Sequence, residues 1–423
     1  MPELWSAPVA AAPIDATITL PGSKSMTNRA LVLAALGTSA GVLHGALCAR
    51  DTDLMAGGLT AMGASVDRRG TEWTVRPSPL RGPCAVDVGN AGTVMRFLPV
   101  IAALASGPVT FDGDPRAGVR PLGPVIDALR ALGVEVDDGG RGGLPFVVHG
   151  GGLPGGTVTV DASRSSQFVS ALLLAACRAD KPLTVRHEGP PMPSGPHVRM
   201  TVAMLRSAGV AVHAGLDEWT VEPGAVGRSA WSVEPDLSNA AAFLAAALVT
   251  GGTVRIPDWP VETTQAGAAL PALFARMGAV VEAGAAGLKL AGGGRIEGVD
   301  VDLHDVGELA PVVAAVCALA DSPSQLRGIA HLREHETDRL AALRTELCKL
   351  GGHVTETADG LLIRPASLHG GTFRTYYDHR LATAAAVLGL AVTGVRVENV
   401  ATTAKTLPDF VPMWQAMLAG AGS

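Results

Sequence analysis

Basic and polar side chains recur next to glycines and small residues at several places along this chain of 423 residues. Near the N-terminus, the segment GSKSMTNR places Lys24, Ser25 and Arg29 directly before an Ala/Leu-rich run that predicts a helix. The start of a helix carries unpaired backbone N–H groups and a partial positive charge, which favour anions. The Gly-x-x-x-x-Gly-Lys-Ser/Thr spacing of a nucleotide-hydrolysing phosphate loop is absent. The segment therefore indicates an anion site or, as the plainer alternative, a solvated helix cap.

Two further segments offer hydrogen-bond donors at expected helix starts. Asn90-Ala91-Gly92-Thr93 predicts a turn in which backbone approaches a ligand closely, and Arg120 follows in the turn DPRAGVRP. Ser165-Ser166-Gln167 supplies hydroxyl and amide donors suited to a phosphate, although serines also occur as simple caps.

Charged residues are densest in the last third of the chain. The run HETDR covers residues 335–339, DHR covers 378–380, and Lys405 lies in TTAKT. Such a run is usually a solvated helix face. Glu308, Arg380 and Lys405, however, fall at equivalent expected helix starts, which favours paired carboxylates working beside cations that hold an anion.

An internal repeat determines where these segments lie. A small or polar turn followed by an Ala/Leu-rich helix pattern begins at Pro21, Gly89, Asp161, Pro235, His304 and Tyr377. A second helix pattern follows in most copies and ends in x-x-G-x-x-V, for which glycine is the expected C-cap. The copies are roughly seventy residues apart, so the chain reads as six α/β units, each too small to bury its own apolar helix faces.

Six units predict two domains of three units each. We expect one domain over residues 21–234 and the other over residues 1–20 plus 235–423, with a ligand site in the cleft between them. The alternating segment Thr17–Leu20 predicts a strand that could join either half. Ser238-Asn239 starts a copy that carries only small residues, which indicates scaffold or a domain junction.

Composition limits the partners and the compartment. The net charge of −6 favours neither nucleic acid nor an anionic membrane as a partner, and no apolar run reaches the length of a membrane span. No signal peptide is evident. Since the five cysteines are far apart and never in C-x-x-C spacing, we expect neither a disulfide framework nor a zinc site, and a cytoplasmic protein.

Seven motifs, in order from residue 20 to residue 410, resemble those of the 5-enolpyruvylshikimate-3-phosphate synthases: LPGSKSMTNRALVLAAL, GNAGTVMR, DPRAGVRP, SSQF, HETDRL, DHRLA and TTAKTLPDF. The resemblance implies an α/β enolpyruvyl transferase fold (an inside-out α/β barrel) of two domains, each with three βαβαββ repeats around a pseudo-threefold axis. It also implies transfer of the enolpyruvyl group of phosphoenolpyruvate to the 5-hydroxyl of shikimate 3-phosphate, in the route to chorismate and aromatic amino acids. Glyphosate would be an inhibitor and the protein a cytoplasmic monomer.

The resemblance also implies roles for single residues. The implied catalytic residues are Lys24, Glu308, Glu336 and His379. The implied shikimate 3-phosphate contacts are Lys24, Ser25, Arg29, Ser165, Ser166, Gln167, Ser194, Glu308, His331 and His335. The implied phosphoenolpyruvate contacts are Lys24, Asn90, Gly92, Arg120, Gln167, Arg339, Arg380 and Lys405. No metal cluster or dinucleotide motif is evident, so we expect no metal and no cofactor.

This sequence departs from the family pattern at several of these positions. His335 stands where Lys is frequent and His331 where Asn is frequent, so both shikimate 3-phosphate contacts are open. Glu308 replaces a frequent Asp, and Phe97 a common Pro. Two alternatives are a related transferase acting on UDP-N-acetylglucosamine, which usually carries a loop cysteine missing from residues 112–121 here, and a non-catalytic repeat scaffold. Because site residues fall in both halves of the chain, we also expect the domains to close over the substrates.

Overall fold

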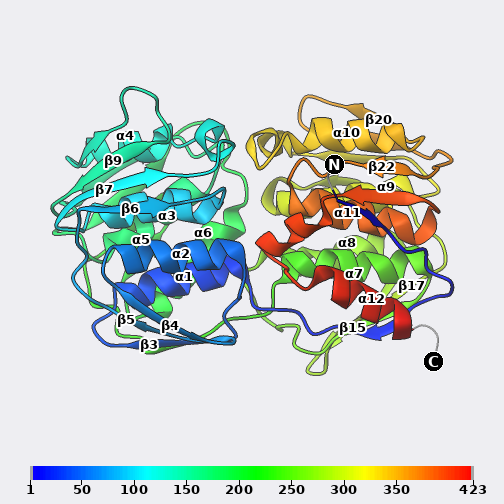
Figure 1. Cartoon of the computed structure of the whole chain (residues 1–423), viewed down its shortest axis with the longest axis horizontal. Helices are drawn as coiled ribbons and strands as arrows, with labels where there is room; N and C mark the ends of the chain where they lie inside the picture. Colours follow the sequence, from blue (N-terminus) through cyan, green and yellow to red (C-terminus); the bar gives the residue numbers. More distant parts are fainter. Residues whose placement is uncertain (1–2, 421–423) are drawn as a thin grey trace. The chain divides into compact units, whose positions relative to one another are not determined.

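The structure, a computed structural model, describes residues 3–420 and divides into two compact units. Unit 2 runs from Gly22 to Glu234. Unit 1 takes the residues up to Pro21 and those from Pro235 onward (Figure 1). The chain thus begins in unit 1, builds all of unit 2, and returns.

Unit 2 contains three sheets of four strands, each served by one inner and one outer helix. Its first repeat comprises α1 (Lys24–Ala35), β3 (Gly41–His44), α2 (Arg50–Ala61), β4 (Ser65–Arg69) and β5 (Glu72–Arg76). The second comprises β6 (Cys84–Asp87), α3 (Gly92–Ala102), β7 (Gly107–Asp112), the 3₁₀ helix η1 (Ala117–Val119), α4 (Gly123–Ala131), β8 (Glu135–Asp137) and β9 (Phe146–Gly150). The third comprises β10 (Gly156–Val160), α5 (Gln167–Ala176), β11 (Leu183–His187), α6 (Gly195–Ser207), β12 (Val212–Ala214) and β13 (Glu218–Val221), and β14 (Ala230–Ser232) follows.

Strand β14 is the last strand of unit 2 in the sequence, and it joins the sheet of the first repeat. It pairs in parallel with β3, giving the sheet order β14-β3-β5-β4. The other sheets, β6-β7-β9-β8 and β10-β11-β13-β12, have the same pattern of one parallel pair followed by antiparallel pairs. A parallel pair needs a crossover, and α3 provides it between β6 and β7 and α5 between β10 and β11.

Unit 1 has the same plan, with its first strands supplied by the N-terminus. Strands β1 (Leu4–Ser6) and β2 (Asp15–Thr17) precede unit 2 in the chain. The first repeat comprises β2, α7 (Leu237–Thr250), β15 (Thr253–Ile256), η2 (Ala266–Ala269), α8 (Leu270–Arg276), β16 (Ala279–Gly284) and β17 (Gly287–Gly292). The second comprises β18 (Asp300–Asp302), η3 (His304–Leu309), α9 (Ala310–Ala318), β19 (Ser324–Arg327), η4 (Ala330–Glu334), α10 (Arg339–Lys349), β20 (His353–Glu356) and β21 (Leu361–Arg364). The third comprises β22 (Gly371–Phe373), α11 (His379–Ala391), β23 (Val395–Glu398), η5 (Val400–Lys405) and α12 (Phe410–Ala419).

The strand expected at Thr17–Leu20 lies earlier, at Asp15–Thr17, and pairs in parallel with β15 of unit 1. The pairing extends only to the bond from the Ile18 N–H to the Arg255 carbonyl, at 2.8 Å, before the chain reaches Pro21. Within residues 3–420, no strand follows α12 in the third repeat of unit 1. Its sheet has the order β1-β23-β22, because β1 pairs antiparallel with β23.

Outer helices end where the glycine pattern predicts. Each of α2, α4, α6, α8 and α10 is followed two residues later by a glycine with positive φ: Gly63, Gly133, Gly209, Gly278 and Gly351. Only glycine adopts this backbone region without a steric penalty, so these positions end the helices.

The inner helices form the core of each unit. In unit 2, α1, α3 and α5 contact one another, and in unit 1, α7, α9 and α11 do. From Phe168 to Ala176 in α5, and from Arg380 to Leu390 in α11, every residue is buried. Helices apolar on all sides belong in the centre of a domain, and each unit has a hydrophobic core of its own.

Candidate active site

In unit 2, the first turns of the three inner helices lie side by side. The amide of Asn28 on α1 donates to Thr93 Oγ1 on α3 at 2.7 Å. On α3, Arg96 donates to Gln167 Oε1 at the start of α5, at 3.1 Å. These bonds join residues near the N-terminal end of each helix, so three helix N-termini point the same way. Their partial positive charges add at one end of the unit.

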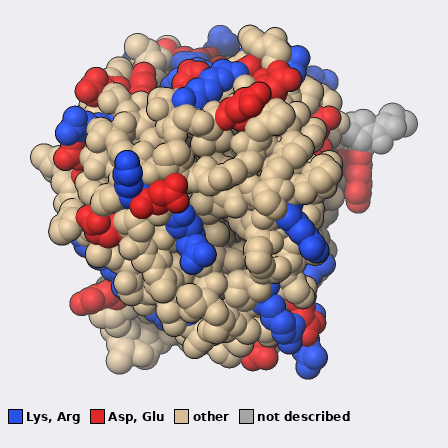
Figure 2. Space-filling model, turned by 90° about the vertical axis from the view of Figure 1, so that its left-hand side faces the viewer, with Lys and Arg blue, Asp and Glu red and all other residues tan. Residues whose placement is uncertain are grey.

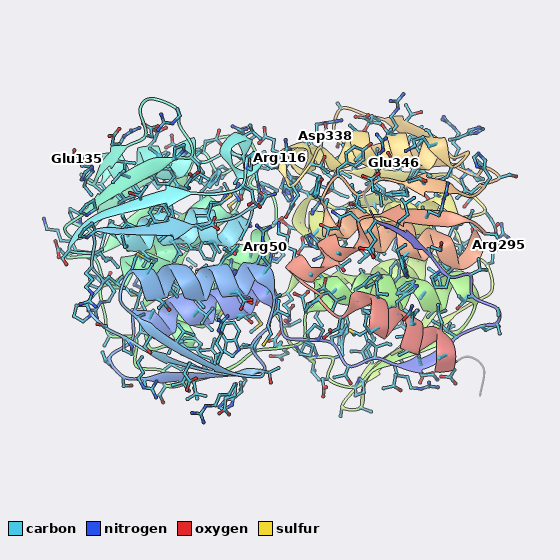
Figure 3. The ribbon with its side chains drawn as sticks, viewed as in Figure 1. Arg50, Arg116, Glu135, Arg295, Asp338 and Glu346 are labelled. Carbon is cyan, nitrogen blue, oxygen red and sulfur yellow. The ribbon has the colours of Figure 1, made fainter. Side chains whose placement is uncertain are left out.

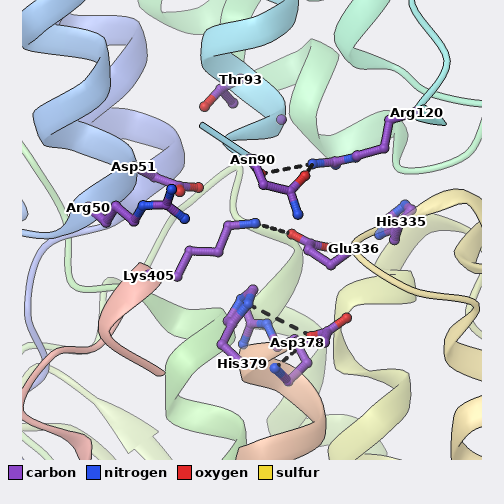
Figure 4. Close-up of polar contacts among 12 residues, drawn as sticks. Arg50, Asp51, Asn90, Thr93, Arg120, His335, Glu336, Asp378, His379 and Lys405 are labelled. Atoms are coloured by element: carbon purple, nitrogen blue, oxygen red, sulfur yellow. Dashed lines mark hydrogen bonds and ion pairs between the residues drawn. The ribbon is translucent and has the colours of Figure 1, made fainter. Parts of the chain in front are cut away.

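Four of the predicted phosphoenolpyruvate residues meet at this end. Arg120 NH1 donates to both the carbonyl and the side-chain oxygen of Asn90, each at 2.9 Å (Figure 4). A β-carbon on Gly92 would lie 3.0 Å from Arg120 NH2 and 3.2 Å from Gln167 Oε1. Glycine at 92 therefore lets these side chains close around the turn.

Arg96 also belongs to this cluster. It was not predicted as a site residue, although it is the last residue of the motif GNAGTVMR. Arg96 is 3% exposed and donates to carbonyl oxygens of Gly92 and Pro121 as well as to Gln167. Arg120 lies directly after η1 and three residues before the start of α4 at Gly123.

Lys24 and Ser25 occupy the first turn of α1, as expected, and Ser23 caps the helix. Lys24 Nζ lies 3.4 Å from Asp51 Oδ2, and Asp51 at the start of α2 is fully buried. Asp51 was not predicted, since one aspartate in ARDTD resembles an ordinary helix-start residue.

Arg29 is enclosed by protein. Its guanidinium donates to Thr201 Oγ1 at 2.7 Å and to the Ser25 and His197 carbonyls at 2.9 and 3.1 Å, and its fractional exposure is 0%. Burial lowers the pKa of Arg29 to about 9. Arg29 thus joins α1 to α6 from behind Ser25.

The remaining predicted residues of unit 2 lie at the starts of α5 and α6. Ser166 is the buried N-cap of α5, and Ser165 Oγ accepts from the Gln167 N–H at 3.3 Å. Ser194 precedes α6 in a left-handed conformation, with φ 57°. The structure thus places all three serines at helix N-termini.

In unit 1, the starts of α7 and α11 and the end of η3 also converge. Arg380 NH1 donates to the Ser238 carbonyl at 2.7 Å, and Ser238 Oγ lies 3.4 Å from Glu308 Oε1. Asn239 binds Thr406 next to Lys405, with its amide 3.1 Å from the Thr406 carbonyl. Ser238-Asn239, interpreted from the sequence as scaffold or a domain junction, lies just after the boundary between the units at Glu234 and Pro235, and it also contacts charged residues from neighbouring copies.

Glu336 is the centre of the charged cluster in unit 1. Its Oε1 accepts from Lys405 Nζ at 2.6 Å (Figure 4). Its Oε2 accepts from Arg339 NH2 at 3.1 Å. Glu336 and Lys405 are 8% and 7% exposed. Two cations beside one carboxylate favour its ionised form.

Asp378, the N-cap of α11, is a further member of this cluster. Arg339 at the start of α10 donates to it twice, through Nε at 2.7 Å and NH2 at 3.1 Å. Burial acts to lower the pKa of Arg339, but Asp378 and then Glu336 outweigh it and raise the pKa above its usual value. Arg380 shows the opposite balance, with burial lowering its pKa.

The three predicted histidines are in or beside this cluster. His379 is 4% exposed, and burial followed by the charge of Arg380 holds its pKa well below the usual value. His331 packs edge-on against the rings of His304 and His335, and burial lowers its pKa to about 4. His335 Nδ1 lies 3.2 Å from Arg339 NH1. Both His331 and His379 are therefore neutral at neutral pH.

Other features limit the kinds of partner. On the face that Figure 2 presents, basic and acidic side chains are interspersed among uncharged ones, unlike the broad basic surface of a nucleic-acid-binding protein. Within residues 3–420, no three His, Cys, Asp or Glu side chains gather as metal ligands would. In the same range, no helix is both long enough and apolar enough to cross a membrane.

Two units of three α/β repeats, with charged groups at the starts of the inner helices, define the enolpyruvyl transferase fold. A crystal structure of the enolpyruvyl transferase NikO from Streptomyces tendae superposes with a TM-score of 0.75, 18% identity, and coverage of 97% of this chain and 96% of that chain. A structure of EPSP synthase from Acinetobacter baumannii gives a TM-score of 0.81 at 24% identity, covering 98% of both chains. At these identities the similarity concerns the fold alone, and it confirms the predicted fold class.

Sequence similarity identifies the family. Residues 9–414 match the model of the EPSP synthase (3-phosphoshikimate 1-carboxyvinyltransferase) family. A 3-phosphoshikimate 1-carboxyvinyltransferase from Kocuria rhizophila is 55% identical, over 99% of this chain and 98% of that protein. The chain belongs to the EPSP synthase family, which confirms the resemblance found from the seven motifs.

Proposed function

We propose that this protein transfers the enolpyruvyl group of phosphoenolpyruvate to the 5-hydroxyl of shikimate 3-phosphate and releases phosphate, in the shikimate pathway to chorismate and aromatic amino acids. The observation that carries the proposal is family membership over residues 9–414, with a relative 55% identical along nearly the whole chain that bears this activity in its name. The repeat scaffold alternative is not favoured, because a scaffold has no use for buried charged residues such as Glu336 and Lys405.

The reaction is an addition followed by an elimination. The 5-hydroxyl oxygen bonds to the central carbon of phosphoenolpyruvate while the methylene carbon gains a proton. The tetrahedral adduct then loses phosphate from the central carbon and a proton from the new methyl group, which restores the double bond. One group must take the hydroxyl proton, and one must give and later remove the carbon-bound proton.

Glu308 is the proposed base for the hydroxyl. Glu308 lies half-buried at the end of η3, and its Oε1 is 3.4 Å from the Ser238 hydroxyl oxygen. Its longer side chain, compared with the Asp frequent in the family, extends its reach by one methylene group.

Glu336 is the proposed group that protonates and later deprotonates the carbon. The contacts with Lys405 and Arg339 favour its carboxylate form, so it can act as an acid only after a cation turns to another anion. The carboxylate or phosphate of phosphoenolpyruvate is that anion in our proposal. Substrate binding would thus draw Lys405 and Arg339 away and leave a buried carboxyl that takes a proton. Lys24 and neutral His379 complete the proposed catalytic set.

The proposed substrate contacts follow the two units. In unit 2, the proposed contacts of shikimate 3-phosphate are Lys24, Ser25, Ser165, Ser166, Gln167 and Ser194. Arg29 acts on this substrate through the Ser25 carbonyl. The proposed contacts of phosphoenolpyruvate are Lys24, Asn90, Gly92, Arg120 and Gln167. In unit 1, Arg339, Arg380 and Lys405 bind phosphoenolpyruvate, and Glu308, His331 and His335 bind shikimate 3-phosphate. Neutral His331 would contribute a hydrogen bond and not a charge.

Several finer properties belong to the same proposal. The protein would act as a cytoplasmic monomer without metal or cofactor, and glyphosate would inhibit it. Since both units supply groups for the same substrates, we propose that ligands draw the units together. Small-angle scattering profiles should differ with and without shikimate 3-phosphate plus glyphosate; superimposable profiles would reject closure.

Phosphate release tests the activity itself. The protein is incubated with phosphoenolpyruvate and either shikimate 3-phosphate or UDP-N-acetylglucosamine. We expect release with shikimate 3-phosphate alone. Release only with the sugar nucleotide would establish the related transferase, and release with neither would restore the scaffold alternative.

A further inference from the structure

The segment that leads from β22 into α11 contains an unusual backbone. Tyr376 and Tyr377 have φ of 52° and 60°, so two bulky residues in succession adopt the left-handed region. Among the residues described, the other non-glycine cases, Ser194 and Asn399, are isolated. This region is disfavoured for residues with a β-carbon and bulky side chain, and it persists only where the surroundings hold it. Asp378 follows immediately.

Glu346 on α10 holds this segment. Its side chain is fully buried, and its Oε1 accepts from the Tyr376 hydroxyl at 2.7 Å. Its Oε2 accepts from the Arg374 backbone N–H at 2.9 Å and from Lys349 Nζ at 2.6 Å. The carboxylate thus binds the segment on both sides of Thr375 (Figure 3 labels Glu346).

The ion pair with Lys349 is not sufficient to offset the cost of burying the Glu346 carboxylate. Lys349 is 42% exposed, and ion pairs that reach solvent contribute little to stability. Removing a carboxylate completely from water is costly, and hydrogen bonds from neighbouring groups are what offset it. Two of the three donors come from the segment of residues 374–376, so the segment is the main partner.

Helix α10 contacts this segment at a second place. Arg339 lies seven residues before Glu346, which puts both on the same side of the helix about 10 Å apart. At that second place the polarity is reversed, since Arg339 donates to Asp378. One face of α10 therefore binds the segment twice: Glu346 accepts a hydrogen bond from Tyr376, and Arg339 donates hydrogen bonds to Asp378.

We propose that Glu346 is a positioning residue: it holds the left-handed Tyr376-Tyr377 turn so that Asp378 orients Arg339 and α11 starts with Arg380 in place. The inference rests on the proposed function, in which Arg339 and Arg380 bind phosphoenolpyruvate. Glu346 itself touches none of the proposed substrate groups.

The two tyrosines of the chain provide a direct readout. Burial, and then the hydrogen bond to Glu346, raise the pKa of Tyr376 to about 12. With ¹³C-labelled tyrosine, the protein gives two phenol signals, and Tyr376→Phe assigns them. In Glu346→Gln the pKa of Tyr376 should fall toward the ordinary value, which reports the contact whether or not the protein is active.

Kinetics then separate positioning from simple stabilisation. We expect Glu346→Gln to raise KM for phosphoenolpyruvate about tenfold, as for one lost charge-assisted hydrogen bond, with a smaller change in KM for shikimate 3-phosphate. Tyr377→Asn should restore most of that loss in the same background, because Asn tolerates the left-handed region. Glu282→Gln, which breaks the exposed pair with Lys289, is the matched control and should change neither constant.

Three results would overturn the proposal. The pKa of Tyr376 could stay unchanged in Glu346→Gln, the kinetic constants could stay within about twofold of the wild type, or Tyr377→Asn could restore nothing. If Glu346→Gln does not fold, Tyr376→Phe removes the one hydroxyl and should raise KM for phosphoenolpyruvate in the same direction; an unchanged KM there rejects the proposal. Inactivity of the wild-type protein with both substrates would reject the proposed function instead, and the tyrosine titration would still report the contact.

Discussion

Arg339 and Asp378 form a two-bond ion pair inside unit 1, Nε to Oδ2 at 2.7 Å and NH2 to Oδ1 at 3.1 Å, with side chains 3% and 0% exposed. The residues are 39 positions apart and stand at the starts of α10 and α11. Because Arg339 also contacts Glu336, which contacts Lys405, one continuous network joins the second and third repeats of unit 1. A planar guanidinium matches a carboxylate in this geometry, which fixes its direction as well as its charge.

Asp378→Asn should destabilise the protein and weaken phosphoenolpyruvate binding together. Removing one partner of a buried pair leaves an uncompensated charge, and we expect a loss of about 3–5 kcal/mol in the free energy of unfolding. Urea denaturation measures this. Asp321→Asn, which breaks an exposed pair with Arg295, is the control and should cost under about 1 kcal/mol. Equal losses in the two variants would contradict a special role for the buried pair.

Arg120→Ala should weaken phosphoenolpyruvate binding by about 2–5 kcal/mol, as for a desolvated charged contact that loses a partner. The variant also frees the Asn90 oxygens, which accept from Arg120 in the structure. Isothermal titration in the presence of shikimate 3-phosphate measures the affinity. Exposed Arg141→Ala in the same unit should bind as the wild type does. Unchanged affinity in Arg120→Ala would remove Arg120 from the site.

Gly92→Ala should impair binding without unfolding the protein. The added methyl group would lie 3.0 Å from nitrogens of both Arg120 and Arg96, so these side chains must shift. We expect KM for phosphoenolpyruvate to rise about tenfold, while alanine's helix propensity offsets part of the strain. Gly57→Ala in α2 meets no atom within 4 Å and should be neutral or stabilising. Steady-state kinetics and thermal melting distinguish the two; a normal KM in Gly92→Ala would show that the turn has room to spare.

Asp138 should make stability depend on acid pH. Arg130, at 2.7 Å, and the Gly142 N–H, at 2.6 Å, lower the pKa of its carboxyl to about 2. Because this pKa lies below that of the unfolded chain, near about 3.9, the stabilisation is complete above that pH and is lost as pH falls toward 2. The difference in unfolding free energy between wild type and Asp138→Asn should therefore be largest at pH 7 and shrink by about pH 3. Exposed Asp180→Asn should show no such trend, and a difference independent of pH would contradict the assignment.

Local patterns in the sequence determined much of the fold. The Ala/Leu-rich runs predicted the inner helices, since a helix apolar on every side must be central, and x-x-G-x-x-V predicted where the outer helices end. Motif order identified the family. The partner of the strand at Asp15–Thr17, the pairing of β14 with β3 and the pairing of β1 with β23 were not predictable, because strand partners distant in sequence leave no local signal.

The candidate site, like the fold, was predictable from the sequence only in part. Expected helix-start positions favoured Glu308, Arg380 and Lys405 as site residues, because unpaired N–H groups and basic side chains hold anions there. The family resemblance, and not the spacing, added Glu336 and Arg339. Only the tertiary structure decided which cation meets which carboxylate, that Arg29 faces protein on every side, and that Ser238-Asn239 belongs to the cluster. It also decided that Glu346 supports the Tyr376-Tyr377 turn. Such contacts depend on burial and on the packing of separate repeats, and neither is written in the spacing of residues along the chain.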